Sequence, residues 1–112
     1  MNGQEEQLKE YENACLWYID DGVTVTIGIT QKAIDLVGGV TDVDLAEVGD
    51  ELTDKASAGE IFGKNTSMEV LTPCSMRITE WNEEVMASVN FIEDDPTGDA
   101  WLLRGEKIAD ER

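Results

Sequence analysis

The chain has 112 residues, of which 25 are Asp or Glu, 8 are Lys or Arg and none is His, so its formal net charge is −17. We expect one domain at this length, and a hydrophobic content of 41% is enough for a modest core. The charge disfavours nucleic acid and anionic membranes as partners, and the lack of His excludes Ser-His and Cys-His nucleophiles and His-ligated metal sites.

The first third of the chain predicts a hairpin followed by a short helix. The charged segment Gln4–Ala14 has weak apolar spacing, which indicates a frayed helix or an acidic tail. Leu16–Ile19 is a short apolar strand ended by the turn signal Asp20–Gly22, and Val23–Ile29 alternates apolar and polar residues as a half-buried strand does. Thr30 can cap a helix that follows it.

That helix is expected over Gln31–Val37, where Gly38 and Gly39 stop it. Val40–Leu45 alternates again and predicts a strand, and Gly63–Thr66 predicts a tight turn. Further strands are predicted at Glu60–Phe62, Met68–Leu71, Met76–Trp81 and Ala100–Arg104, with a short helix or turn at Asn82–Ser88 and a loop at Asp94–Gly98. Many short strands between regular turns favour a sandwich or barrel.

The first dozen residues lack the basic and apolar regions of a secretory signal, and no apolar stretch approaches the roughly 20 residues that span a bilayer. We therefore expect a cytoplasmic protein in which Cys15 and Cys74 are free. The three tryptophans are expected to pack in the core. The acidic residues Glu93, Asp94, Asp95 and Asp99 do not follow an EF-hand spacing, so we interpret them as a solvated loop and expect no metal site.

Three motifs in order resemble the H protein of the glycine cleavage system, in the lipoyl/biotinyl-carrier superfamily. They are Gly28–Thr30, Leu36–Gly49 and Asp95–Leu102, and Trp17 falls where the family has an early Trp. The resemblance implies an all-β fold with short helices, a flattened barrel-sandwich hybrid of the lipoyl-domain type, over residues 15–104. Residues 1–14 would then be an acidic extension and 105–112 an acidic tail.

In the family that this sequence resembles, a lysine at the tip of a β-hairpin is amide-linked to lipoate, which shuttles an aminomethyl group between enzymes. Counting back from Pro73, the family register places that lysine on Asn65, and the three residues before it on Phe62, Gly63 and Lys64. An Asn side chain has an amide in place of the primary amine, so it cannot form the lipoyl linkage.

Two interpretations of this hairpin remain. In the first, the hairpin is only a turn, because Asn65 tolerates positive φ and Gly63 suits a tight reversal. In the second, Lys64 is a lipoyl acceptor displaced by one residue, although such a slip turns a side chain to the opposite face. The Met-Lys-Met triplet of biotin carriers is absent.

We favour the first interpretation: a non-enzymatic binding or regulatory protein without a cofactor. Its protein partner would be basic, given the charge of −17, and could belong to glycine cleavage or to another lipoate-dependent system. In the alternative, lipoate on Lys64 carries an aminomethyl or another one-carbon or acyl group.

Overall fold

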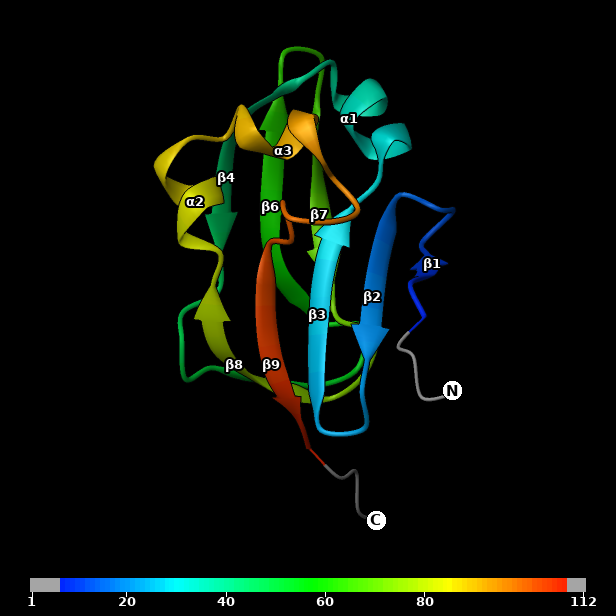
Figure 1. Ribbon diagram of the computed structural model, residues 1–112, viewed down its shortest axis with the longest axis vertical. Coiled ribbons are helices and arrows are strands. Elements are labelled where there is room, and N and C mark those ends of the chain that lie inside the picture. Colours follow the sequence, from blue (N-terminus) through cyan, green and yellow to red (C-terminus); the bar gives the residue numbers. More distant parts are fainter. Residues whose placement is uncertain (1–6, 109–112) are drawn as a thin grey trace.

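The computed structural model describes residues 7–108, whose strands form two antiparallel sheets (Figure 1). The larger sheet has the strand order β1-β2-β3-β9-β8-β5, and the smaller has the order β4-β6-β7. The strands are β1 Lys9–Tyr11, β2 Leu16–Asp20, β3 Thr24–Ile29, β4 Val40–Leu45, β5 Glu51–Leu52, β6 Ser57–Gly63, β7 Ser67–Leu71, β8 Met76–Trp81 and β9 Leu103–Lys107. The helices are α1 Gln31–Val37, α2 Glu83–Ala87 and α3 Phe91–Asp94. The predicted all-β class with short helices is confirmed.

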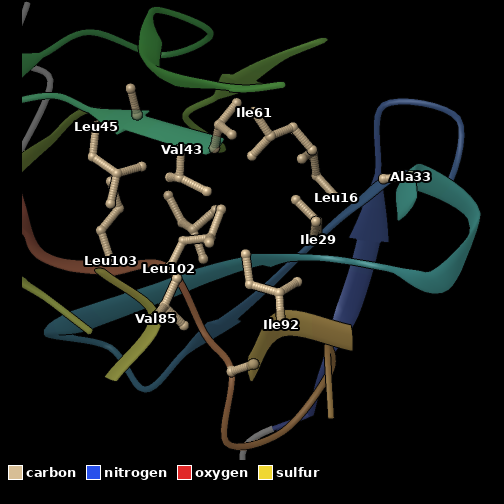
Figure 2. Close-up of a cluster of buried hydrophobic side chains, with 14 of the residues drawn as sticks. Leu16, Ile29, Ala33, Val43, Leu45, Ile61, Val85, Ile92, Leu102 and Leu103 are labelled. Atoms are coloured by element: carbon tan, nitrogen blue, oxygen red, sulfur yellow. The ribbon is translucent and has the colours of Figure 1, made fainter. Parts of the chain in front are cut away.

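The hydrophobic core lies between the two sheets. Val43, Leu45 and Ile61 of the smaller sheet point towards side chains such as Leu16 and Leu103 of the larger one (Figure 2). The helices α2 and α3 add buried side chains at the margin of the core. Each fully buried aliphatic side chain contributes about 1.5–3 kcal/mol relative to its exposed state, so this interior is what holds the two sheets together.

The predicted hairpin β2–β3 and the helix after it are confirmed. The Thr30 side chain accepts a hydrogen bond from the Ala33 N–H, and Gly38 ends α1 in the left-handed conformation with φ 84°. The N–H groups of Gly38 and Gly39 both donate to the carbonyl of Ile34, which closes the last turn of the helix. Local sequence chemistry therefore decides where α1 begins and ends.

The N-terminal prediction is wrong over Lys9–Tyr11, which forms strand β1 against β2 and is neither a helix nor a tail. Tyr11 stacks edge-on against Tyr18 with ring centroids 5.4 Å apart, and its hydroxyl donates to the carbonyl of Leu71. Burial raises the pKa of Tyr11 well above its usual value, so the hydroxyl stays protonated as a donor. These contacts reach across the fold, which is why spacing within the segment did not reveal them. Residues 4–6 of the predicted segment lie outside the described residues.

The last strand is displaced from its predicted position, because β9 begins and ends three residues later. The carbonyl of Asp95 accepts hydrogen bonds from the N–H groups of Gly98 and Ala100, which keeps this stretch in turns. The larger sheet thus includes residues on both sides of the predicted 15–104 domain, at β1 and at the end of β9. The two-residue strand β5 had no prediction, and helix α3 contains Glu93 and Asp94, which were predicted to lie in a loop.

Over residues 7–108 no helix is both long and apolar enough to cross a membrane.

Candidate functional site

The tip of the β6–β7 hairpin carries Lys64 and Asn65, the two candidate residues. The Gly63 N–H donates to the Thr66 carbonyl over 2.9 Å, which closes the turn around them. The hairpin register pairs Phe62 with Ser67. The tip stands at the upper end of the molecule beside α1 (Figure 1), so the predicted hairpin and turn are confirmed.

The tip is hydrogen-bonded to the C-terminal end of α1. The Asn65 N–H donates to the Val37 carbonyl over 2.8 Å. A Cβ on Gly63 would lie 2.2 Å from the same carbonyl oxygen, and a Cβ on Gly38 would lie 2.6 Å from Cγ of Asn65. Two glycines therefore let the turn and the helix end approach each other closely, with the Asn65 side chain against Gly38.

The turn does not use the tolerance of Asn65 for positive φ. Neither Asn65 nor Lys64 has a positive φ, whereas Gly38 and Gly39 of the neighbouring helix end do. The left-handed backbone of this region therefore lies in the helix cap, and Asn65 sits in the turn in an ordinary conformation. Its contacts with α1 are tertiary, and no local turn rule points to them.

Lys64 differs from its neighbour in having no anchor. Its side chain is exposed at the turn, and within the described part of the chain it has no hydrogen bond and no ion pair. Asn65 is also exposed, but its side chain rests on Gly38. Both predicted residues therefore lie at one tip, where the Lys64 amine is free and the neighbouring Asn65 side-chain amide contacts Gly38.

Below this tip, the outer face of the smaller sheet is acidic. Its strands alternate, so that buried residues such as Val43 and Ile61 face the core and their neighbours face away from it. The register aligns Asp44, Glu60 and Glu69 in one row across the three strands, and Asp42, Phe62 and Ser67 in the next row. We call the set Asp42, Asp44, Glu60, Phe62 and Glu69 the acidic face.

A shallow hollow of about 250 Å³ lies at one end of the acidic face. Its floor includes Gly59, where a Cβ would lie 2.4 Å from the Asp44 carbonyl oxygen, so the strands approach closely there. The hollow is lined by Asp44, Leu45, Ala46, Ser57, Gly59 and Glu60. Sequence reasoning missed this face, because strand alternation shows that residues point outward but not which strands lie side by side.

The other candidate groups have structural roles. Glu93 accepts a hydrogen bond from the Val40 N–H, and the Asp95 carboxylate accepts one from the Asp99 N–H. In residues 7–108 no three His, Cys, Asp or Glu side chains are grouped so that they could hold a metal ion. Cys15 and Cys74 are not joined in a disulfide.

The core role predicted for the tryptophans is confirmed for two of them. Trp17 is buried, and its indole N–H donates to the carbonyls of Ile29 and Pro96. Trp81 packs against the core from its edge. Trp101 is half-buried and lies under the Arg104 guanidinium, 3.9 Å from the ring centroid, so it takes part in a cation–π contact that the sequence did not indicate.

Comparisons with known proteins identify relatives of this chain. The family model described as "Glycine cleavage H-protein" matches residues 7–111. The chain is 39% identical over 88 residues to a glycine cleavage system H protein of Clavibacter sepedonicus, covering 79% of this chain and 72% of that protein. It is 36% identical over 103 residues to the H protein of Staphylococcus haemolyticus, covering 92% of this chain and 78% of that one.

The fold has a counterpart among solved structures. A crystal structure of a glycine cleavage system H protein from Mycobacterium marinum aligns with a TM-score of 0.80 at 26% identity, covering 100% of this chain and 90% of that one. The barrel-sandwich hybrid fold that the resemblance implied is thereby confirmed. From its sequence motifs, its hairpin and these matches, the chain belongs to the glycine cleavage H-protein family.

Proposed function

We propose that this chain is an H-protein family member that carries no lipoyl group and acts without catalysis, by binding a protein partner. The observation that carries the proposal is the chemistry of residue 65. The family register places the lipoyl lysine on Asn65, whose amide has no nucleophilic amine to form the linkage. The fold of a carrier is kept, while the group that would hold the cofactor is replaced.

The surroundings of Asn65 support this proposal. Its N–H donates to the Val37 carbonyl and its side chain contacts Gly38, so Asn65 connects the turn to the end of α1. A tip held in this way presents a fixed surface to a partner, with little ordering entropy left to lose on binding.

The charge distribution supports a basic protein as the partner. A net charge of −17 attracts cationic surfaces from a distance and speeds their encounter. Enzymes of glycine cleavage, or of another lipoate-dependent system, are the first candidates, because the chain keeps the shape of the carriers that such enzymes bind.

A second candidate function is favoured by one specific observation, the free and exposed amine of Lys64 at the same tip. If Lys64 held lipoate, the chain would be a swinging-arm carrier for an aminomethyl or another one-carbon or acyl group. The arm would start one residue away from the family position, and in a hairpin such a step changes the face from which a side chain leaves.

Incubation with lipoate–protein ligase, ATP and lipoate, followed by intact-mass measurement, separates the two candidates. We expect the wild-type chain to stay unmodified. The Asn65→Lys variant should gain one lipoyl group, and the double variant Lys64→Ala/Asn65→Lys should gain it as well. A wild-type chain that gains the group, and loses it in Lys64→Ala, would replace the first proposal by the second. Asn65→Ala is the control for changes in turn structure. An unmodified Asn65→Lys chain would mean that Phe62 and Gly63 also prevent recognition by the ligase.

A further inference from the structure

We propose that the acidic face binds an extended basic segment of the partner protein, with one Lys or Arg side chain in the hollow beside Gly59 and another over Phe62. This inference deepens the proposed function, because it rests on partner binding and names the surface and the chemistry of the segment. Three features of the described residues carry it: unpaired carboxylates, an aromatic ring outside the core, and the spacing of the two rows.

The carboxylates of the acidic face repel one another. Asp44 lies directly opposite Glu60, and Glu60 directly opposite Glu69. Cross-strand neighbours have Cβ atoms about 4.5–5.5 Å apart, and like charges in that position destabilise a sheet. Glu60 accepts a hydrogen bond from the Ser67 hydroxyl over 2.8 Å, but this bond brings no positive charge.

The basic side chains that form ion pairs within the described residues lie elsewhere. All four ion pairs found among residues 7–108 join side chains of the larger sheet. They are Arg77–Glu51, Arg77–Glu106, Arg104–Glu80 and Lys107–Asp20. Four carboxylates of the larger sheet therefore have a cationic partner within that sheet. No ion pair found among the described residues involves a carboxylate of the acidic face, and a basic partner would supply the missing cation.

Phe62 makes the surface selective for cations with an apolar stem. The ring is half-buried, yet it is absent from the half-buried side chains that pack on the core within the described residues. It stands opposite Asp42, so a guanidinium or ammonium group over the ring would meet a carboxylate at the same time. The hollow beside Gly59 is smaller than pockets for drug-sized ligands, which run to about 300–1,000 Å³, and it suits a single side chain.

The spacing of the two rows fits an extended chain. Alternate residues along a strand are about 7 Å apart, so the row through Asp42 and the row through Asp44 are separated by that distance. Alternate residues of an extended segment repeat at the same interval and point to the same side. Basic residues at every second position of the partner segment would therefore meet both rows.

The test uses the full-length recombinant chain, not exposed to a lipoate ligase, and fluorescence anisotropy with a labelled eight-residue peptide in which Arg and Thr alternate. We expect Asp44→Asn/Glu60→Gln/Glu69→Gln to weaken binding by about tenfold or more, because close charge pairs are lost. The matched control Asp54→Asn/Glu83→Gln/Asp94→Asn removes the same charge from exposed positions outside the acidic face and should change affinity by no more than about twofold.

A second peptide, with four consecutive Arg followed by four Thr, tests the spacing at constant charge. We expect it to bind several-fold more weakly than the alternating peptide, and amide chemical-shift changes caused by the alternating peptide to fall on β4, β6 and β7. Equal losses in the two triple variants, equal affinity for the two peptides, or shift changes on the larger sheet would each overturn the proposal.

Folding does not confound the result, because removing like charges should leave the melting temperature of the triple variant unchanged or higher. The single variants Asp44→Asn and Glu69→Gln, with smaller losses in the same direction, give a second measurement. Since the peptide assay uses unmodified protein, a lipoylated native chain would overturn the proposed function without touching this result. Failure of the peptide assay would overturn the docking surface alone.

Discussion

The two hairpins at opposite ends of the molecule are closed by different means (Figure 1). In the β2–β3 turn, the Asp20 carboxylate accepts a hydrogen bond from the Gly22 N–H, and the Asp21 carboxylate accepts from Val23 and Thr24. The carboxylates that accept these bonds belong to the turn itself, and Lys107 of β9 adds an ion pair to Asp20. The β6–β7 turn instead takes support from α1, a helix that lies more than two dozen positions earlier in the chain.

The difference is that local residues determine the β2–β3 turn to a large extent, whereas the β6–β7 turn also depends on tertiary contacts. A turn that carries its own hydrogen-bond acceptors is favoured by its local sequence. A turn that depends on a helix end is fixed only when the fold is complete, and its tip then has a defined position relative to the rest of the molecule. The second kind suits a tip and a sheet face that meet a partner.

The largest effect expected from this contrast is that of Gly63→Ala. A Cβ there would lie 2.2 Å from the Val37 carbonyl oxygen and 2.6 Å from that of Gly39, so backbone must move, at a cost of about 3 kcal/mol in the free energy of unfolding. Gly22→Ala is the control, because a Cβ there meets nothing within 4 Å and only the positive φ costs about 1 kcal/mol. Urea denaturation measures both. Equal costs would contradict the close approach of the β6–β7 tip to α1.

The contact between Asn65 and Gly38 predicts a coupled pair of substitutions. Gly38→Ala should cost about 2 kcal/mol, from its positive φ and from collision with the Asn65 side chain. In an Asn65→Ala background only the cost of the φ remains, so the double-mutant cycle should give a coupling near 1 kcal/mol. Additivity within about 0.3–0.5 kcal/mol would mean that the Asn65 side chain does not rest on the helix end.

The two sheets also differ in the charges of their cross-strand pairs. Glu69→Gln removes the repulsion from Glu60 and should raise the free energy of unfolding by about 0.2–1 kcal/mol in a urea titration. The control Glu106→Gln removes a carboxylate 2.6 Å from Arg77 on the larger sheet and should lower stability slightly, if at all. A Glu69→Gln chain less stable than wild type would refute the repulsion.

The smallest effect concerns pH and the β2–β3 turn. Partial burial opposes ionisation of Asp20, but hydrogen bonds from the Gly22 N–H and the Lys107 ammonium outweigh it and lower the pKa of Asp20. Hydrogen bonds from the Thr24 and Val23 N–H groups lower the pKa of Asp21. Both carboxylates therefore stabilise the fold above their unfolded pKa of about 3.9, and the contribution is lost as pH falls through the folded values.

Asp21→Asn should accordingly reduce the loss of stability that urea titrations record between about pH 5 and pH 2. Asp54→Asn is the control, because it removes the same charge at an exposed position whose carboxylate accepts no hydrogen bond among the described residues. An equal reduction in both variants would mean that the acid sensitivity is a general effect of charge.

The sequence predicted the elements that local contacts determine and missed those that depend on tertiary contacts. Thr30 and Gly38 set the two ends of α1 by local capping, and the alternation of Val40–Leu45 indicates a strand. These elements were therefore predictable from the sequence. Strand β1 pairs with β2, and the Tyr11 hydroxyl donates to the Leu71 carbonyl sixty positions away, a contact that no local pattern indicates.

The candidate site was predictable in position but not in environment. The register located Lys64 and Asn65, and the structure places both at the tip. The contact between Asn65 and Gly38 depends on which elements are neighbours in space. The same is true of the row that contains Asp44, Glu60 and Glu69. Strand pairing is a tertiary property, so the acidic face could not be read from spacing.

The intact mass of this protein isolated from its native host, with peptide mapping of the segment around Asn65, tests most directly whether the chain carries a lipoyl group. We expect the mass of the unmodified chain and an unmodified Lys64. A molecule that carries one lipoyl group on Lys64, or on any other lysine, would contradict this expectation.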